Sequence, residues 1–552
     1  MNSPIRHLIL LNALCLVCAG VIAHAEDASN TTMTSTNAAA STTNATETAT
    51  NAAMPAATSA SNVAGAGTNA TFSISIRDCI TRALQNNFEI RIQRLNPSIQ
   101  SWGITLAQGA FDPVLSASAE YTDSVLPSQN GFNSISTNGT VFTTNLTMTG
   151  SAARTLTLSP SVGVGGTFAS GARYDLSASP VGRAPSLRDN FVYSGEAAFS
   201  VAQPLLKNFG FDVNTAQIRI ARKGQQIAIH NFINQVITSI STVESAYYEL
   251  VFSIEDQKAK LDDLTLAKQL LDETRRKVQI GVSSPLDVTT AESGVASREE
   301  AVILADRTIK DNENALKLLI SQNVMEFRNV SFVPVDYPVV ETVVTDVDRS
   351  IRVAMQKRPD YLAAINNLER QNIQVKFSRN QLWPELDVNG SYGLNGVGGS
   401  FDDWNDSVAS RNYPVWAAGV SLTFPLGNRQ ARANYQSARL TATQLLLQLK
   451  QLEQQIVVGV DNAAGHVETN LKSVDAAVVA RRLAEESYQA ERTKLQAGTS
   501  TTLNVLTQES ALADARSREI RARASYSESL VALAQAEGTT LERHNIVLNE
   551  RF

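Results

Sequence analysis

The sequence is poor in cysteine and has no strong excess of either charge. Three cysteines occur in 552 residues, and two of them, Cys15 and Cys18, lie close to the amino terminus. A mature chain without these two residues would keep only Cys79 and could not form an internal disulfide. The net charge is −6, and Lys and Arg do not gather with aromatic residues as a nucleic-acid surface requires. We therefore expect no nucleic-acid partner.

Long apolar runs are also missing. After residue 25, no segment reaches the roughly 18 continuous apolar residues that a membrane-spanning helix needs. The apolar run before that point follows a basic start and ends at the small-x-small sequence Ala23-His24-Ala25. This pattern predicts a secretory signal peptide over residues 1–25, with which Cys15 and Cys18 would leave.

Catalytic and metal-binding motifs are missing as well. The sequence contains no G-x-S-x-G and no H-E-x-x-H. His230, His466 and His544 stand apart from any cluster of cysteines or carboxylates at metal-ligand spacing. We predict a protein that is not an enzyme and that has no cofactor and no metal site.

Residues 26–71 contain few large apolar side chains. They are almost entirely Ala, Thr, Ser and Asn, a composition that cannot bury enough surface to offset the entropy of ordering the backbone. We interpret this stretch as a disordered spacer.

One segment is present twice. KVQIGVSSPLDVTTAE (277–292) and KLQAGTSTTLNVLTQE (494–509) align at a constant offset of 217. The matching residues are Lys277, Gly281, Leu286, Val288, Thr290 and Glu292 in the first copy and Lys494, Gly498, Leu503, Val505, Thr507 and Glu509 in the second. Such a repeat indicates an internal duplication.

The duplication extends to two whole halves, which we place at residues 72–335 and 336–552. Pro113 corresponds to Pro384 at offset 271, whereas Pro204 corresponds to Pro425 at offset 221. The first half therefore carries an insertion, over about residues 123–190. Its Ser- and Gly-rich sequence could form external loops or an extra pair of wall strands, and we favour external loops. DDWND (402–406) is similarly expected to be a surface loop.

Period-two alternation marks short strands in both halves. Leu115, Ala117, Ala119 and Tyr121 alternate with polar residues in the first half, as Leu386, Val388, Gly390 and Tyr392 do in the second. One apolar face and one polar face suit a membrane barrel better than a sandwich core.

The strands are followed by long helical patterns. Residues 213–279 and 428–496 contain no proline and show a heptad-like apolar seam, which predicts helices roughly 100 Å long. Gly281 and Gly498 then predict helix stops. Return helices are expected over about 286–323 and 503–537, and shorter helices over 77–109 and 346–382. Each half should place one long helix beside two shorter ones laid end to end.

This arrangement resembles the TolC family of outer-membrane efflux channels. The resemblance covers about residues 72–545 and depends on the duplicated order of elements, on QPLLKNFG (203–210) and FPLGNRQAR (424–432), and on G-x-x-x-x-L-[D/N]-V at both tips. It implies an α+β membrane protein that forms a homotrimer. Four strands from each protomer would build a 12-stranded barrel among outer-membrane lipids, above a periplasmic helical tunnel.

The resemblance also implies partners and sites. A periplasmic adaptor (membrane fusion) protein would bind the helical tips and connect the tunnel to an inner-membrane pump or to the ABC transporter of a type I secretion system. The implied docking residues are Lys277, Gly281, Ser284, Leu286, Asp287, Val288, Lys494, Gly498, Thr501, Leu503, Asn504 and Val505. The implied periplasmic constriction comprises Asp287, Asn504, Thr507 and Glu509. The alternative is a trimeric coiled-coil structural protein or adhesin of the cell envelope.

Overall fold

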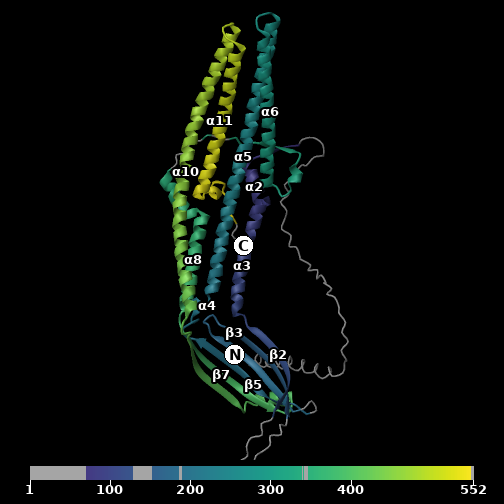
Figure 1. The fold of residues 1–552 in the computed structure, drawn as a ribbon, viewed down its shortest axis with the longest axis vertical. Coiled ribbons are helices and arrows are strands. Elements are labelled where there is room, and N and C mark those ends of the chain that lie inside the picture. The colour runs from purple at the N-terminus through teal and green to yellow at the C-terminus, as the bar shows by residue number, and fades with distance from the viewer. Residues whose placement is uncertain (1–69, 128–151, 186–188, 338–339, 341–345, 549–552) are drawn as a thin grey trace, which may run out of the picture. The chain divides into compact units, whose positions relative to one another are not determined.

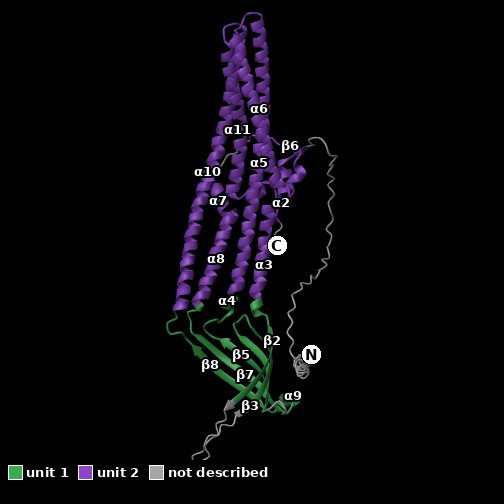
Figure 2. Ribbon diagram, turned by 45° about the vertical axis from the view of Figure 1, so that its right-hand side comes forward, with its two compact units in different colours: residues 1–66, 109–215, 380–428 green, residues 67–108, 216–379, 429–552 purple. Residues whose placement is uncertain are grey.

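The computed structural model describes residues 70–127, 152–185, 189–337, 340 and 346–548. The chain divides into two compact units, one of strands and one of helices (Figure 2). Each unit draws on both halves of the sequence, because the chain enters the strand unit once in each half. The predicted signal peptide and most of the predicted spacer lie outside the described residues.

The strand unit is one antiparallel sheet with the order β2-β3-β4-β5-β7-β8. Short helical turns, η2 (Gly109–Phe111) and α4 (Phe211–Asn214), flank its strands. The strands are β2 (Val114–Pro127), β3 (Ala152–Thr167), β4 (Arg173–Ala184), β5 (Val192–Pro204), β7 (Glu385–Gly398) and β8 (Pro414–Thr423).

The strand count corrects our expectation of four. The described residues contribute six strands to this sheet, and two of them, β3 and β4, come from the insertion that we interpreted as external loops. β3 pairs along β2 from Val114↔Gly165 to Pro127↔Ala152, and β4 pairs with both β3 and β5. The composition of the insertion is misleading because Ser, Thr and Gly suit the polar face of a barrel wall as well as they suit a loop.

The two faces of the sheet have different chemistry, as the alternation predicts. Tyr121, Leu158 and Gly182 lie opposite one another across three strands, and the same face continues through Tyr193 to β7 and β8. The residues that share this face are mostly Leu, Val, Ala, Tyr, Phe and Trp. The other face carries mainly Ser, Thr, Asn and carboxylates, including Ser118, Ser161, Ser177 and Glu196.

Two prolines interrupt the middle of the sheet. Pro160 of β3 and Pro180 of β4 lie in the gap where the β3–β4 ladder pauses, between Leu158↔Gly182 and Val162↔Ala178. A proline has no N–H to donate to a ladder. Across the other ladder Pro180 faces Gly195, whose carbonyl accepts a hydrogen bond from the Trp404 indole Nε1 at 3.2 Å.

Trp404 belongs to a short helix, α9 (Phe401–Ala409), which corrects our interpretation of DDWND as a surface loop. Ser400 caps the helix through the Asp403 N–H, and Trp404 is only 3% exposed. A Cβ at Gly396 would come within 2.7 Å of the Trp404 carbonyl oxygen. Because position 396 belongs to the apolar face, α9 packs on that face, where a glycine leaves room for its backbone.

The helical unit contains two long helices, α5 (Ala216–Gln279) and α10 (Arg429–Gln496), in confirmation of the uninterrupted heptad patterns (Figure 1). α6 (Pro285–Ile320) and α11 (Thr502–Glu537) return beside them. The remaining helices are α2 (Ile76–Asn86), α3 (Phe88–Gln108), α7 (Val347–Lys357), α8 (Pro359–Asn380) and α12 (Thr540–Arg543), with η3 (Val324–Phe327). In the described part of the chain, no helix has the length and apolar character to cross a membrane.

The short helices cover the half of each long helix that its return helix leaves bare. α2 and α3 pack against α5. α7 packs against α10, and α8 contacts α10 through the Tyr361 hydroxyl, which donates to Glu453 at 3.0 Å. Each pair is broken at a single residue, Asn87 or Arg358, whose extended backbone ends the first helix. This confirms the expected arrangement of two short helices end to end beside a long one.

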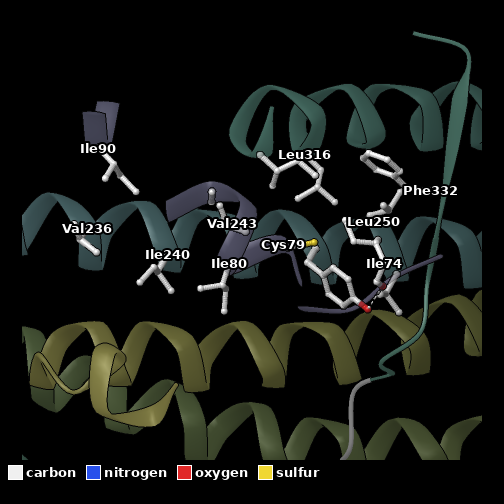
Figure 3. Close-up of a cluster of buried hydrophobic side chains, with 14 of the residues drawn as sticks. Ile74, Cys79, Ile80, Ile90, Val236, Ile240, Val243, Leu250, Leu316 and Phe332 are labelled. Carbon is white, nitrogen blue, oxygen red and sulfur yellow. Dashed lines mark hydrogen bonds between the residues drawn. The ribbon is translucent and has the colours of Figure 1, made fainter. Parts of the chain in front are cut away.

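The largest core of the helical unit lies where α2, α5 and α6 meet a two-stranded parallel sheet of β1 (Ala70–Ile74) and β6 (Val330–Pro334) (Figure 3). Tyr247 is completely buried there, and its hydroxyl donates to the Ile74 carbonyl at 3.3 Å while it accepts from the Asp336 N–H at 3.0 Å. Burial raises the pKa of Tyr247 to about 12 and that of the Cys79 thiol to about 12. Cys79 is therefore an unreactive core residue.

The packing of α9 predicts different outcomes for two glycines of the same strand face. Gly396→Val should displace α9 because the new Cβ meets backbone and side-chain atoms of Trp404 and Val408. Gly390→Val is the matched control, since nothing lies within 4 Å of its Cβ position. We expect faster amide hydrogen exchange over residues 401–409 in the first variant alone; equal exchange in both would contradict the packing.

Candidate functional site

The two helical tips have the same backbone structure. After α5, the Gly281 N–H donates to the Val278 carbonyl at 3.0 Å and the Val282 N–H to the Lys277 carbonyl at 2.8 Å. After α10, the corresponding bonds run from Gly498 to Leu495 at 3.2 Å and from Thr499 to Lys494 at 2.9 Å. Both pairs form a Schellman motif, which satisfies the last carbonyls of a helix.

The two repeated glycines are required by their backbone dihedral angles and not by a lack of room for a side chain. Gly281 has φ +73° and Gly498 has φ +78°, both in the left-handed region. Nothing lies within 4 Å of the position that a Cβ would occupy at either residue. The repeated lysines contribute their backbone carbonyls to the turn. The Lys494 side chain pairs with Glu491 at 3.0 Å.

The helices restart in two slightly different ways. Ser284 begins α6 with a capping box, in which the Asp287 carboxylate accepts from the Ser284 N–H at 2.9 Å. Thr501 begins α11 by accepting from the Asn504 N–H at 3.3 Å, and the Asn504 side-chain amide instead donates to Ser500 at 3.4 Å. Asp287 is therefore used as a helix cap, and Asn504 does not reproduce it.

The predicted docking residues separate into exposed and buried ones. Leu286 is 72% exposed and Leu503 is 61% exposed. Val505, in contrast, is 1% exposed and packs with Leu270, Tyr488 and Leu512. Val288 similarly packs against a core cluster that includes Val295. The two valines repeat because each anchors its return helix, so Val505 is removed from the set of partner-contacting residues.

The structure adds two exposed apolar residues that we did not select from the sequence. Ile280 is 74% exposed and Val282 is 72% exposed, one on each side of Gly281. Their counterparts at offset 217 are Ala497 and Thr499, so the two tips share a backbone but differ in surface. We selected residues that are identical in the two copies, and these two positions differ between the copies. The sequence did offer one signal for them, namely two large apolar side chains beside a glycine that ends a helix.

The predicted constriction residues lie in different environments. Thr507 is exposed, and its hydroxyl donates to the Leu503 carbonyl at 2.9 Å. Glu509 is 1% exposed and lies 3.5 Å from Arg298 Nε of α6. Because it is buried within the helical unit, Glu509 does not line an aqueous entrance, and we withdraw it from the constriction.

Glu509 belongs to a charged seam, which we define as the ion pairs and hydrogen bonds that connect the α5–α6 hairpin to the α10–α11 hairpin. Asp263 of α5 lies 3.3 Å from Arg516 of α11, and Asp256, at heptad spacing from it, accepts from Ser517. The further members of the seam are Glu249 with Arg521 and Glu273 with Arg492. Burial raises the pKa of the Asp263 carboxyl, although Arg516 opposes the effect.

The pKa of Glu509 is raised to about 7 by burial, which outweighs the nearby positive charge of Arg298. Among the described residues, neither carboxylate oxygen of Glu509 has a hydrogen-bond partner, so the charged form gains little to offset its desolvation. Close to neutral pH, the seam therefore holds a carboxyl group that is partly protonated.

Comparisons with known proteins identify the family. The family model described as "Outer membrane efflux protein" matches residues 153–322 and 350–539, one match in each predicted half. Together the two matches cover more than half of the chain. The chain belongs to the outer membrane efflux protein family. It is accordingly an outer-membrane protein.

Individual relatives of this efflux protein are distant in sequence. It is 23% identical to outer membrane protein TolC of Vibrio cholerae over 56% of this chain and 70% of that protein. It is 22% identical to the probable efflux pump outer membrane protein TtgC of Pseudomonas putida over half of each chain.

Solved structures agree on the fold. The Campylobacter jejuni CmeC outer membrane channel superposes with a TM-score of 0.61 at 15% identity, covering 84% of this chain and 86% of CmeC. The Vibrio cholerae outer membrane protein VceC superposes with a TM-score of 0.61 at 16% identity, covering 84% of this chain and 96% of VceC. The TolC-like α+β fold expected from the sequence is thus confirmed.

The raised pKa of Glu509 predicts that the stability of the folded protein depends on pH. Its folded pKa of about 7 exceeds its ordinary value of 4.5, so the folded protein binds the proton more tightly than the unfolded chain does. The stability that this group contributes is present below pH 4.5 and is lost as the pH rises to about 7. Glu509→Gln should therefore raise the thermal midpoint at about pH 8 and flatten its decline from about pH 5.

The measurement is thermal unfolding of the detergent-solubilised protein followed by circular dichroism. Glu468→Gln is the control, because the Glu468 carboxyl is fully exposed and its pKa is lowered by Lys472. A decline of the same size in wild type and in Glu509→Gln would show that Glu509 does not titrate in this range.

Proposed function

We propose that this protein is the outer-membrane channel of a tripartite efflux pump or of a type I secretion system, and that it acts as a homotrimer without catalytic chemistry of its own. Its partners are a periplasmic adaptor protein and an inner-membrane pump or ABC transporter. The observation that carries the proposal is the repetition of one Schellman turn, bond for bond, at the ends of two helices of 64 and 68 residues.

The length of the helices supports this function. At 1.5 Å per residue, α5 and α10 are each roughly 100 Å long, a span that suits a conduit across a compartment and exceeds the needs of a globular core. Both tips lie at the same end of the helical unit (Figure 1). A homotrimer presents six such tips, so a ring of adaptor subunits meets the same backbone turn at each position.

The exposed surface of the tips suits protein binding. Ile280, Val282 and Leu286 project from the first tip and Leu503 from the second, each more than half exposed. Exposed apolar groups of this size, gathered at the end of a structure, mark interaction sites in soluble regions of proteins. Lys277 and Lys494 add positive charge beside them, and Asp287, Asn504 and Thr507 remain candidates for the periplasmic constriction.

The tip backbone provides the first test. The double variant Gly281→Val, Gly498→Val forces two β-branched residues into the left-handed region, at about 1 to 2 kcal/mol each. Burial along the long helices exceeds this cost, so we expect normal trimer levels but loss of export. Drug or dye accumulation is measured in cells that lack their own channel and carry the cognate adaptor and pump.

The matched control for this variant is Gln279→Val, Gln496→Val, which adds the same side chain to exposed helical positions beside each turn. We expect export close to wild type in the control. Wild-type export by the glycine double variant, with undiminished cross-linking to the adaptor, would exclude the tips as the docking site.

The difference between the tips provides a second test. Ile280→Ser, Val282→Ser removes exposed apolar surface without changing the backbone, so we expect weaker adaptor cross-linking. Ala497→Ser, Thr499→Ser changes the counterpart positions, where little apolar surface exists, and should leave cross-linking unchanged. If both variants cross-link equally well, the apolar surface of the first tip does not bind the adaptor.

A further inference from the structure

The inserted hairpin occupies an unexpected place in the sheet. β2 and β5 would be neighbours in a four-stranded arrangement, but β3 pairs with β2 on one side and β4 pairs with β5 on the other. The hairpin is thus paired on both of its edges, and it separates β2 from β5 in the sheet. β3 and β4 have 16 and 12 residues, and about 9 to 11 residues suffice for a strand to cross a bilayer.

The side chains of the hairpin continue the two faces of the wall. On the apolar face, Val162 lies opposite Ala117 and Ala178, and Leu176 lies opposite Phe199. On the polar face, Ser177 lies opposite Gly163 and Ala198. In the described strands, the charged residues on the apolar face are Asp123 and Arg154, which form a two-bond pair at 2.9 and 2.5 Å. β3 and β4 therefore match a membrane-embedded wall.

The free edges of the sheet are β2 and β8. Every residue of β8 is exposed, and so is almost every described residue of β2, whereas β3, β4 and β5 are mostly half-buried. All neighbours in the sheet are antiparallel, so the first and last of its six strands run in opposite directions. The β2 edge of one copy can therefore pair antiparallel with the β8 edge of the next.

Hydrocarbon allows no open sheet edge, because unpaired N–H and C=O groups there have no water to bond. We infer that the partner of each free edge is a second copy of this chain, β2 against β8, and that the assembly closes with six strands from each copy. This inference rests on the homotrimer of the proposed function. Three copies then form an 18-stranded barrel instead of the 12-stranded barrel that the family resemblance implies.

The additional strands change what the outer-membrane section can pass. Barrel diameter grows roughly linearly with strand number, and barrels of 16 to 18 strands leave an aqueous channel. The inner face of this barrel would be lined by Ser, Thr, Asn and carboxylates of the polar face. The outer-membrane section would then be a wide polar pore, and the limit on cargo size would lie elsewhere along the conduit.

Thiol labelling tests whether the hairpin forms part of the wall. Ser177→Cys and Ala178→Cys lie on opposite faces of β4, and both are half-buried. In proteoliposomes, a charged maleimide should label Ser177→Cys and spare Ala178→Cys, at a rate difference of at least tenfold. Ala198→Cys and Ala197→Cys on β5 should give the same pattern in a barrel of either size. Equal labelling of both β4 variants, with the β5 pattern intact, would overturn the inference.

Electron cryomicroscopy tests the closure directly. A variant in which a short Gly/Asn linker replaces residues 128–190 leaves β2 beside β5 and should close with 12 strands. We expect the membrane section of the wild type to be about one and a half times as wide. Equal diameters in two trimers would overturn the 18-stranded barrel and leave the proposed function untouched.

The same images give the number of copies. A count other than three would contradict the proposed homotrimer, whereas the labelling pattern of β4 would still decide whether the hairpin belongs to the wall.

Cysteine pairs that join the β2 and β8 edges provide the last check. Ser118→Cys combined in turn with Ala417→Cys, Gly419→Cys and Ser421→Cys should cross-link separate copies in one register, and failure in every register would contradict this edge pairing.

Discussion

A strand edge that cannot stay open in hydrocarbon is the constraint on which the strand unit depends. This constraint explains three features of the sheet together: its apolar face, its exposed first and last strands, and the opposite directions of those two strands. A soluble sheet could end at β8 with a charged or covered edge. Here Val415, Val420 and Leu422 leave β8 apolar and bare, and only another strand removes the cost of its unpaired backbone groups.

The helical unit follows a different rule, because water can reach its outer surface. Carboxylates of α5 at heptad spacing meet arginines and a serine of α11 where apolar residues would be expected. Such buried and half-buried pairs contribute little net stability, but they define which residues face each other along two long rods. The seam therefore fixes register between hairpins, a property that Leu and Ala contacts alone specify weakly.

The helices, their stops and their caps are predictable from the sequence because each depends on local chemistry. Gly281 and Ser284 mark a turn that needs no distant partner. The inserted strands, which we considered but did not favour, and α9, which we did not predict, both depend on residues far away in the sequence. Pro160 and Pro180 have no N–H for a ladder, yet both lie in strands that distant strands pair with. Trp404 lies in a polar stretch, and the acceptor for its indole, the Gly195 carbonyl, comes from a distant strand.

The place of α9 has a consequence for which end of the sheet can lie at the surface of a membrane. A Cβ at Gly396 would point towards α9, so this helix lies on the face of the sheet that would meet lipid. Asp402, Asp403 and Asp406 flank its buried Trp404 in the sequence. The connection between β7 and β8 thus covers the end of β7 on the apolar face and leaves the polar face of the sheet uncovered there. Because three carboxylates are costly in hydrocarbon, the end of the sheet that carries α9 belongs at the polar surface of the membrane.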